Sequence, residues 1–425
     1  MSKKELTITQ DPEPIDSAYA GQLQVRVISS LGMIPVENAT VTISITGNPD
    51  SALETLTTDE SGLTPIVELP APALNLSQNP SEDQPYSEYN IEVDAEGYEP
   101  TMVSGSEILP DELSLQAIQL FPLADAPAND EVIVIPAHTL FAEYPPKIPE
   151  DEIKPMPDTG EIVLSRVVVP EYVIVHDGVP SDTSAPNYWV RYKDYIKNVA
   201  SCEIYATWSE AALYANILTI MSFTLNRVYT EWYRNQGYDF TITSSTAYDQ
   251  KWIYGRNIFD NIDFLVDSVF ANYLSRPGVR QPILTSYCDG QRVTCAGLSQ
   301  WGSQYLAQEG YTAIEIIRYF FGNDMYINTA DYISGVPSSY PGYALTIGST
   351  GDKVRQMQTQ LNRIARNYPA LPTITADGIF GQQTAEAVRI FQRIFNLPVT
   401  GVVDYATWYQ ISDVYVGVTR IAEPM

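Results

Sequence analysis

The stretch from Tyr195 to Arg227, YIKNVASCEIYATWSEAALYANILTIMSFTLNR, constrains the fold more than any other part of the chain. Apolar residues recur at helical spacing in its first part, which predicts an amphipathic helix. Ser209 has the chemistry of an N-cap, and Glu210 would lie in the first turn of a second helix. The stretch therefore predicts two helices joined by an elbow at residues 202–208.

The elbow contains one carboxylate, Glu203, with Tyr205 and Trp208 close by in the sequence. Aromatic walls disfavour the charged form of a carboxyl group, as in enzymes that cleave sugars. Glu203 is therefore a candidate general acid. The alternative is that it caps a helix or forms a salt bridge at the surface, and the local sequence leaves both interpretations open.

The negative charge is concentrated in the first third of the chain. Residues 1–161 contain 5 Lys and Arg against 29 Asp and Glu, a net charge of −24 out of −28 for the whole chain. Without a basic stripe to neutralise phosphates, nucleic acid is excluded as a partner. The acidic front part is expected to be a solubilising or masking segment.

Composition and length predict a globular protein with two to four domains. The chain has 425 residues, of which 44% are hydrophobic and 18% charged. Three cysteines do not make a disulfide framework. No run approaches the roughly twenty apolar residues of a membrane span, so no membrane partner is expected. The first residues, MSKKELTITQDPEPIDS, lack the apolar region of a secretory signal.

Residues 1–120 are predicted to form an all-β sandwich. The segments VRVIS, ATVTISI, YNIEVDA and LQAIQL alternate as strands do and are separated by Gly, Pro and Asn. The motifs VENATV (36–41), TTDESG (57–62) and EGYEP (96–100) resemble the carboxypeptidase-regulatory, transthyretin-like sandwich. This is a structural module, and it contains no catalytic cluster.

Residues 121–166 are rich in proline and acidic side chains, as in YPPKIPEDEIKPMPDTGE. This composition predicts an extended linker and a processing site for a protease. Within it, residues 132–135 (VIVI) could add a strand to a neighbouring sheet.

The segment 167–334 is predicted to be an α+β domain with a core of its own. Its expected helices lie at 193–202, 209–236, 257–275, 300–309 and 312–322, and its expected strands lie near 171–176, 188–192 and 282–287.

Residues 340–425 are predicted to form a separate three-helix domain. The segments GSTGDKVRQMQTQLNRIA and ADGIFGQQTAEAVRIFQRIFNLPVTGVVDYATW each carry apolar residues on one helical face. They resemble the small peptidoglycan-binding module, which implies peptidoglycan as a partner. The tail at 414–421 is expected to be one more strand.

The helical stretch and the blocks after it resemble the stage II sporulation protein D family, whose members are peptidoglycan lytic transglycosylases. The shared pattern is an aromatic-Ile-x-x-Val helix, a Glu, and a Trp-x-Glu-Ala-Leu helix start. It is followed by QKWIYG (250–255), SYCDG (286–290) and SQWG (299–302). The resemblance covers about residues 173–327. It implies that Glu203 is the single catalytic acid and later the base, leaving 1,6-anhydro-muramic ends.

A hydrolase acting on the same glycan would need a second carboxylate beside Glu203. The candidates in this domain are Asp194, Glu210, Asp249 and Asp289. Glu210 is expected to serve the helix N-terminus instead, and a transglycosylase needs only one carboxylate.

Five further residues are candidates for contacts with the sugar, because amides and hydroxyls bond sugar hydroxyls and Trp stacks on a pyranose ring. They are Gln250, Tyr254, Ser299, Gln300 and Trp301. The alternatives are that Trp301 is a core residue and that Ser299 caps the helix after it.

Cys288 and Cys295 enclose the segment DGQRVT, and some relatives bind zinc with two Cys and a nearby His. The histidines here, His138 and His176, lie outside that neighbourhood, so zinc is a weak candidate. A disulfide or two packed thiols are the alternatives, and we expect no cofactor.

The order sandwich, acidic linker, sporulation D-like domain and binding module resembles the clostridial spore cortex-lytic enzymes. Members of that family are pro-enzymes located in the spore, and a subtilisin-like protease activates them in germination to cleave cortex glycan. A tethered front domain acts at high effective concentration, so cutting the linker is expected to free it and activate the enzyme. The rival interpretations are an inactive wall-binding scaffold and a hydrolytic glycosidase.

Overall fold

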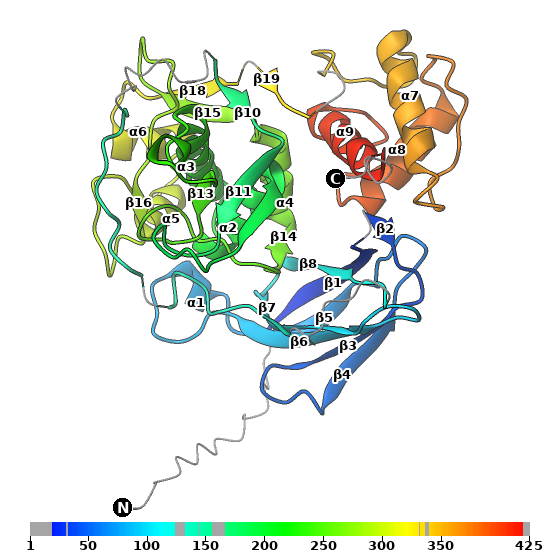
Figure 1. Ribbon diagram of the computed structural model, residues 1–425, viewed down its shortest axis with the longest axis horizontal. Helices are drawn as coiled ribbons and strands as arrows, with labels where there is room; N and C mark the ends of the chain where they lie inside the picture. Colours follow the sequence, from blue (N-terminus) through cyan, green and yellow to red (C-terminus); the bar gives the residue numbers. More distant parts are fainter. Residues whose placement is uncertain are drawn as a thin grey trace, which may run out of the picture.

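The computed structural model describes residues 19–30, 33–123, 132–142, 144–154, 166–330, 332–335 and 340–419. Figure 1 shows a strand-rich N-terminal domain, a central domain of helices and short strands, and a group of C-terminal helices. The chain is thus multidomain, with a β-rich N-terminal region and a helical C-terminal region, as the sequence predicts.

The N-terminal domain consists of two sheets that pack their apolar faces together. Alternation along β1 (Tyr19–Ser29) buries Leu23, Val25 and Val27, and the second sheet buries Val41 and Ile91 against them. The first sheet has the order β14-β8-β1-β2 with β5 also paired to β1, and the second has the order β4-β3-β6-β7-β9. The bounds are β2 Ile34–Pro35, β3 Thr40–Ile45, β4 Ala52–Thr57, β5 Val67–Ala71, β6 Ser87–Asp94, β7 Thr101–Ile108 and β8 Leu113–Leu120, with the short helix α1 Asn75–Gln78 after β5.

Two strands of these sheets come from later parts of the chain. β9 (Val132–Val134) pairs in parallel with β7, so residues 132–134 add a strand as the sequence allowed. Gly105 (φ +90°) permits this approach, because a Cβ there would lie 2.5 Å from the carbonyl oxygen of Ile135. β14 (Ile258–Phe259) of the central domain pairs antiparallel with β8. The sheet is therefore shared between two domains.

Buried polar contacts join the same two domains. Arg256 pairs with Glu107, with 2.6 Å between Nη2 and Oε2, and both side chains are fully buried. The side-chain amide of Asn257 donates to the backbone oxygen of Glu107 (2.9 Å), and Gln116 donates to the backbone oxygen of Gly255 (2.9 Å). These buried contacts, together with the shared sheet, join the N-terminal domain to the central domain.

The central domain is built around α3 (Glu210–Tyr229), which is buried along almost its whole length. Its neighbours include α2, α4, α5 and α6. The remaining elements are β10 Val168–Val169, β11 Tyr172–His176, β12 Asn187–Arg191, α2 Tyr192–Glu203, η1 Arg234–Gln236, β13 Ile242–Thr243, α4 Asp260–Val269, β15 Asn272–Ser275, β16 Tyr287–Cys288, β17 Leu298–Ser299, α5 Gln300–Gln308, α6 Ala313–Phe321, β18 Tyr326–Thr329 and β19 Tyr332–Ile333. The helix expected at 257–275 is shorter, because its first residues pair as β14 and its last form β15.

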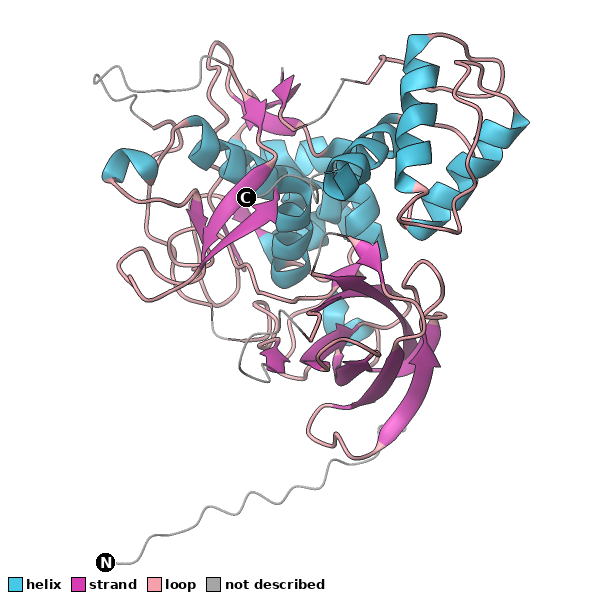
Figure 2. Cartoon of the chain, turned by 45° about the vertical axis from the view of Figure 1, so that its right-hand side comes forward, coloured by secondary structure: helices cyan, strands magenta, loops and turns pink. Residues whose placement is uncertain are grey.

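The C-terminal domain contains α7 (Asp352–Ile364), α8 (Gln382–Ile394) and α9 (Tyr405–Thr419). The strand expected at 414–421 is wrong for the described residues, since Val414 to Thr419 continue α9. Figure 2 shows α9 between the other two helices and the central domain. α9 packs on both α7 and α4, and one hydrophobic core runs from the central domain into these helices.

Stability at the junction of the first two domains should depend on pH through Glu112. Burial, with the nearby carboxylates of Asp260 and Asp111, raises the pKa of Glu112 from its ordinary 4.5 to about 8. A carboxyl group whose pKa is raised in the folded state contributes its full stability when the pH is below its pKa in the unfolded state. This stability is lost as the pH rises through the folded-state pKa of about 8. We expect the thermal unfolding temperature to fall more between about pH 5 and about pH 9 in the wild type than in Glu112→Gln. Equal pH dependence in both proteins would contradict this assignment.

Candidate active site

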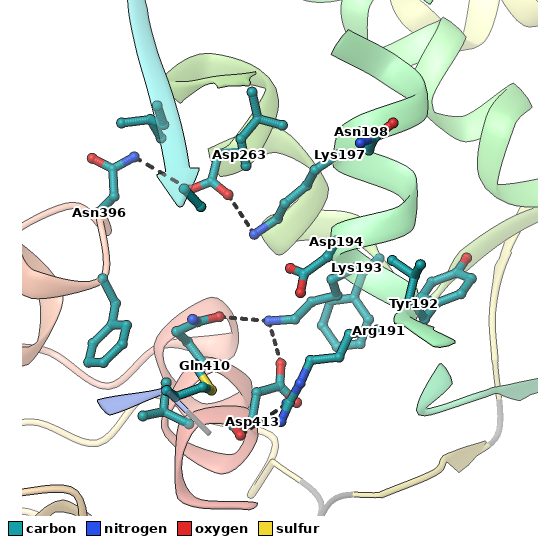
Figure 3. A pocket seen from close by; sticks show the side chains of 18 of the residues that line it. Arg191, Tyr192, Lys193, Asp194, Lys197, Asn198, Asp263, Asn396, Gln410 and Asp413 are labelled. Atoms are coloured by element: carbon teal, nitrogen blue, oxygen red, sulfur yellow. Dashed lines mark hydrogen bonds and ion pairs between the residues drawn. The ribbon is translucent and has the colours of Figure 1, made fainter. Parts of the chain in front are cut away.

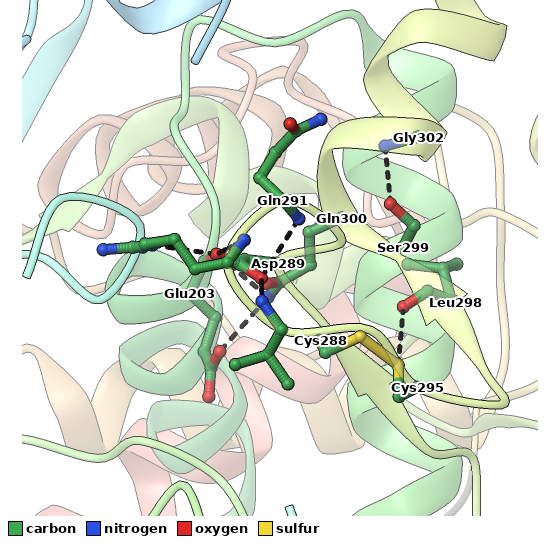
Figure 4. Close-up of a disulfide and its surroundings, with 11 residues drawn as sticks. Glu203, Cys288, Asp289, Gln291, Cys295, Leu298, Ser299, Gln300 and Gly302 are labelled. Carbon is green, nitrogen blue, oxygen red and sulfur yellow. Dashed lines mark hydrogen bonds and ion pairs between the residues drawn. A yellow bond between two sulfur atoms is a disulfide. The ribbon is translucent and has the colours of Figure 1, made fainter. Parts of the chain in front are cut away.

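Glu203 is the last residue of α2, and its side chain is completely buried. Figure 4 shows it beside the start of α5. Its Oε1 accepts hydrogen bonds from the backbone N–H of Lys251 (2.8 Å) and from the hydroxyl of Tyr287 (3.3 Å). Its Oε2 accepts from Nε2 of Gln300 (3.1 Å). Donors from three separate segments therefore hold the carboxylate in one orientation.

The start of α5 positions Gln300. Its Nε2 also donates to the backbone oxygen of Glu203 (3.0 Å), so one amide binds both the backbone and the side chain of Glu203. Ser299 caps the helix, since its hydroxyl accepts from the N–H of Gly302 (2.9 Å); this was the alternative to a sugar contact. Gly290 (φ +78°) is required beside it, because a Cβ there would lie 1.8 Å from the Ser299 oxygen.

Cys288 and Cys295 form a disulfide, which closes the loop before α5 (Figure 4). Between them, the buried Asp289 accepts from the backbone N–H of Val293 (2.9 Å) and from the guanidinium of Arg292 (2.9 Å). Burial opposes ionisation, but these hydrogen bonds together lower the pKa of Asp289. Among the described residues, no group of three or more His, Cys, Asp and Glu is placed to hold a metal ion.

The other predicted sugar contacts do not touch Glu203. Gln250 is fully buried, and its Oε1 accepts from the hydroxyls of Tyr195 (3.2 Å) and Thr224 (2.7 Å). Tyr254 is 39% exposed and stacks on Tyr188. The side-chain contacts of Gln250 therefore place it in the interior, whereas Tyr254 lies at the domain junction.

Trp301 is part of an aromatic cluster under the elbow. Its ring centroid lies 5.0 Å from that of Trp208 and 5.9 Å from that of Tyr205. It is 7% exposed, as expected of a core residue. Of the five candidates for sugar contacts, the structure therefore brings Gln300 into hydrogen-bond contact with Glu203.

The candidate second carboxylates are engaged elsewhere or exposed. Asp249 is buried and accepts from Arg227 (2.7 Å), Tyr233 (2.7 Å) and Thr243 (2.7 Å). Asp194 and Glu210 are exposed on α2 and α3. The groups that fix Glu203 are all hydrogen-bond donors. None of the candidate second carboxylates forms a hydrogen bond with it.

Part of the expected linker packs on the central domain instead of running free. We call residues 138–142 and 144–154 the strap. At its start, His138 stacks on Tyr205 with ring centroids 4.4 Å apart, and Thr139 donates to the backbone oxygen of Cys202 (3.3 Å). The guanidinium of Arg292 donates to four successive strap carbonyls, at residues 139–142. The described residues of this part of the linker contain no helix or strand, but they are bound to the central domain and do not form a free tether.

The middle of the strap lies against the residues around Glu203. Tyr144 is 6% exposed, and burial, followed by the charge of Glu203, raises its pKa. Nζ of Lys147 lies 4.1 Å from the ring centroid of Tyr287 and donates to the backbone oxygen of Asp249 (2.5 Å). Burial lowers the pKa of Lys147, and the nearby charge of Glu203 opposes this. The strap thus contributes an aromatic ring and a cation to the surroundings of the carboxylate.

Sequence reasoning did not single out Tyr287 or the strap. Tyr287 lies in the SYCDG block, so the resemblance already contained a signal for it. The strap had none beyond its composition, because its partners, such as Arg292, lie about 150 residues away in the sequence.

A separate cavity of about 360 Å³ lies where the three domains meet (Figure 3). Lys193 on α2 pairs with Asp413 on α9 (2.7 Å), and Lys197 pairs with Asp263 on α4 (2.6 Å). Glu203 does not line this cavity. The Lys193–Asp413 pair joins the central and C-terminal domains, whereas the Lys197–Asp263 pair lies within the central domain. We assign the cavity to the domain junction and the candidate active site to Glu203.

Comparison with known proteins supports the assignment of the C-terminal domain. Residues 350–411 match PG_binding_1, described as a peptidoglycan binding domain, and this region is therefore a peptidoglycan-binding domain. No curated protein matches the chain significantly. Among the described residues, none of the helices has the length and apolar character of a membrane span.

Two solved structures show weak similarity. The Bacillus anthracis TIE protein is 14% identical (TM-score 0.18) over 24% of this chain and 17% of its own. GBS52, the minor pilin of Streptococcus agalactiae, is 13% identical (TM-score 0.18) over 27% of this chain and 49% of its own. The chain thus spans about a sixth and about half of these proteins, and a TM-score of 0.18 does not establish a shared fold.

Proposed function

We propose that this protein is a peptidoglycan lytic transglycosylase, made as a pro-enzyme, that cleaves spore cortex glycan. The observation that carries the proposal is Glu203, a buried carboxylate held by Lys251, Tyr287 and Gln300. It occurs in the same chain as a peptidoglycan-binding domain, which associates the protein with the cell wall. The fixed carboxyl group would supply the acid for this reaction, and the binding domain would hold the protein on its glycan.

In the proposed reaction the protonated carboxyl group of Glu203 gives its proton to the glycosidic oxygen between muramic acid and glucosamine. The bond from muramic C1 to that oxygen breaks, and the glucosamine leaves with a new 4-hydroxyl group. The muramic C6 hydroxyl attacks C1, and its proton returns to the Glu203 carboxylate. No water is consumed, so a single carboxylate suffices as acid and then as base.

Latency is the second part of the proposal. With the strap in place Glu203 has no exposed surface, and Lys147 of the strap lies over the ring of Tyr287, whose hydroxyl donates to Glu203. A glycan cannot reach the carboxylate in this arrangement. A protease of the subtilisin type, cutting within 121–166, is the proposed activator, and the spore is the proposed location.

The nature of the products tests the reaction type. Peptidoglycan is digested with protease-nicked protein, and the soluble muropeptides are analysed by mass spectrometry. A transglycosylase leaves anhydro-muramic ends, which are lighter by one water than the reducing ends that a hydrolase leaves. Reducing ends would establish the hydrolytic alternative.

The complete burial of Glu203 also favours a second candidate, a wall-binding scaffold without catalysis. Under that function the nicked protein would sediment with peptidoglycan and release no soluble muropeptides. The product analysis therefore separates the two functions.

A further inference from the structure

The far end of the strap places two glutamates in two arginine forks. Glu150 accepts from Arg227 through both carboxylate oxygens, at 2.5 and 3.0 Å. Glu152 accepts from Arg276 in the same way, at 2.7 and 2.9 Å. Both pairs are bidentate, the arrangement in which a guanidinium recognises a carboxylate most specifically.

Both arginines belong to the central domain and are held there independently of the strap. Arg227, on α3, also donates to Asp249 (2.7 Å), which lies beside the Lys147 contact. Arg276 follows β15 and also pairs with Asp324. When the strap leaves, Arg227 keeps Asp249 and the backbone oxygen of Tyr248, and Arg276 keeps Asp324. The N–H groups that bound the two glutamates are then left for another acceptor.

The described residues of the strap contact the central domain from the Glu203 elbow to these two arginines. Ile148 donates to the backbone oxygen of Ala247 (2.8 Å), and Glu152 accepts from the backbone N–H of Leu284 (2.8 Å). An extended chain segment therefore already occupies a continuous track that begins at the candidate acid and ends at two carboxylate-binding forks.

We propose that this track is the substrate groove and that Arg227 and Arg276 bind carboxylates of the peptide side chains on peptidoglycan. Glu150 and Glu152 then stand in for substrate carboxylates while the strap is docked. This inference rests on the proposed function, and it adds the chemical group that is recognised and the residues that recognise it. A polymer such as chitin, which carries no carboxylates, would not use the forks.

The test measures sedimentation of full-length protein with insoluble peptidoglycan, in a Glu203→Gln background so that no cleavage occurs. Glu150→Gln with Glu152→Gln removes the strap's two carboxylates. We expect its affinity for peptidoglycan to rise about tenfold, the size expected for charge-assisted hydrogen bonds. Peptidoglycan whose carboxylates have been amidated should show no such rise.

A matched control separates the forks from net charge. Asp151 lies between the two glutamates and is exposed, as is Asp83. Asp151→Asn with Asp83→Asn changes the net charge equally, and we expect its affinity to stay that of the parent protein.

The arginines are tested in the Glu150→Gln, Glu152→Gln protein. Arg276→Gln should reduce the rise in affinity, because only the Arg227 fork remains, whereas Arg280→Gln, at an exposed position four residues later, should leave the full rise. Arg276→Lys keeps the charge and loses the fork, so it gives the same answer should the Gln variant not fold.

An equal rise on native and amidated peptidoglycan, or no rise at all, would overturn the inference and leave the forks as clamps for the strap alone. Because binding is measured without catalysis, this result is independent of the reaction. Carboxylate-dependent binding together with an absence of anhydro ends would refute the transglycosylase and retain the groove.

Discussion

Glu203→Gln is expected to lower the turnover of nicked protein on peptidoglycan by a factor of about 10²–10⁴, the usual contribution of a positioned acid. The fold should survive, because a glutamine oxygen can still accept from Lys251 and Tyr287. Its amide nitrogen would face Nε2 of Gln300, so a modest loss of stability is also expected. Release of soluble muropeptides measures the rate, and thermal unfolding measures the stability.

Glu210→Gln is the matched control. Glu210 is an exposed carboxylate in the first turn of α3, seven positions from Glu203, and it forms no hydrogen bond with the candidate acid. Its turnover should equal that of the parent protein. A Glu203→Gln protein that still clears peptidoglycan at the parent rate would remove Glu203 from the mechanism.

The local sequence was sufficient to predict the elbow. The helix expected at 193–202 corresponds to α2, and Glu203 lies where it ends. The helix expected at 209–236 corresponds to α3, which ends earlier, at Tyr229. Apolar periodicity and the N-cap chemistry of Ser209 are short-range signals, so they survive folding. Ser209 makes no side-chain cap hydrogen bond, although it occupies the N-cap position.

The contacts that surround the site could not be predicted in this way, because they join distant parts of the chain. Arg227 and Glu150 are 77 residues apart, and Arg256 and Glu107 are 149 residues apart. A proline-rich acidic tract suggests an unfolded linker by composition, yet two arginine forks and the Arg292 contacts hold this one in place. Composition gives no information on such partners.

The error at the C-terminus has a similar cause. Val414, Val416 and Val418 alternate with other residues as in a strand, but they belong to α9 and all three are buried. This helix is apolar on several sides because it lies between the helical domain and α4. Packing on two sides removes the one-sided pattern on which helix prediction depends.

The contacts between domains also change the expected course of activation. A tether that is cut was expected to release the acidic domain. The buried Arg256–Glu107 pair and the shared β8–β14 edge hold this domain to the central domain whether or not the linker is intact. We therefore expect nicked protein to elute as one species, with residues 1–120 still bound, and only the strap to leave the site.

Full-length protein is expected to be nearly inactive on cortex, and limited proteolysis within 121–166 is expected to activate it. The strap is attached at both ends, so it acts at an effective concentration on the order of millimolar or more. A strap-open form populated at about 1% would allow activation of up to about 100-fold on cutting. Turbidity loss of decoated spores, with intact and nicked protein at equal concentration, measures this ratio.

Two strap variants show whether the strap itself causes the latency. Tyr144→Ala with Lys147→Ala removes two strap side chains on which the charge of Glu203 acts, and it should activate intact protein without any cut. Ile148→Ala is the matched control, because its side chain is 46% exposed and its backbone hydrogen bond to Ala247 is kept. Equal rates for intact and nicked protein would mean that the docked strap does not limit access to Glu203. Activation by the cut alone, with the double variant still inactive, would assign the latency to another part of the 121–166 tract.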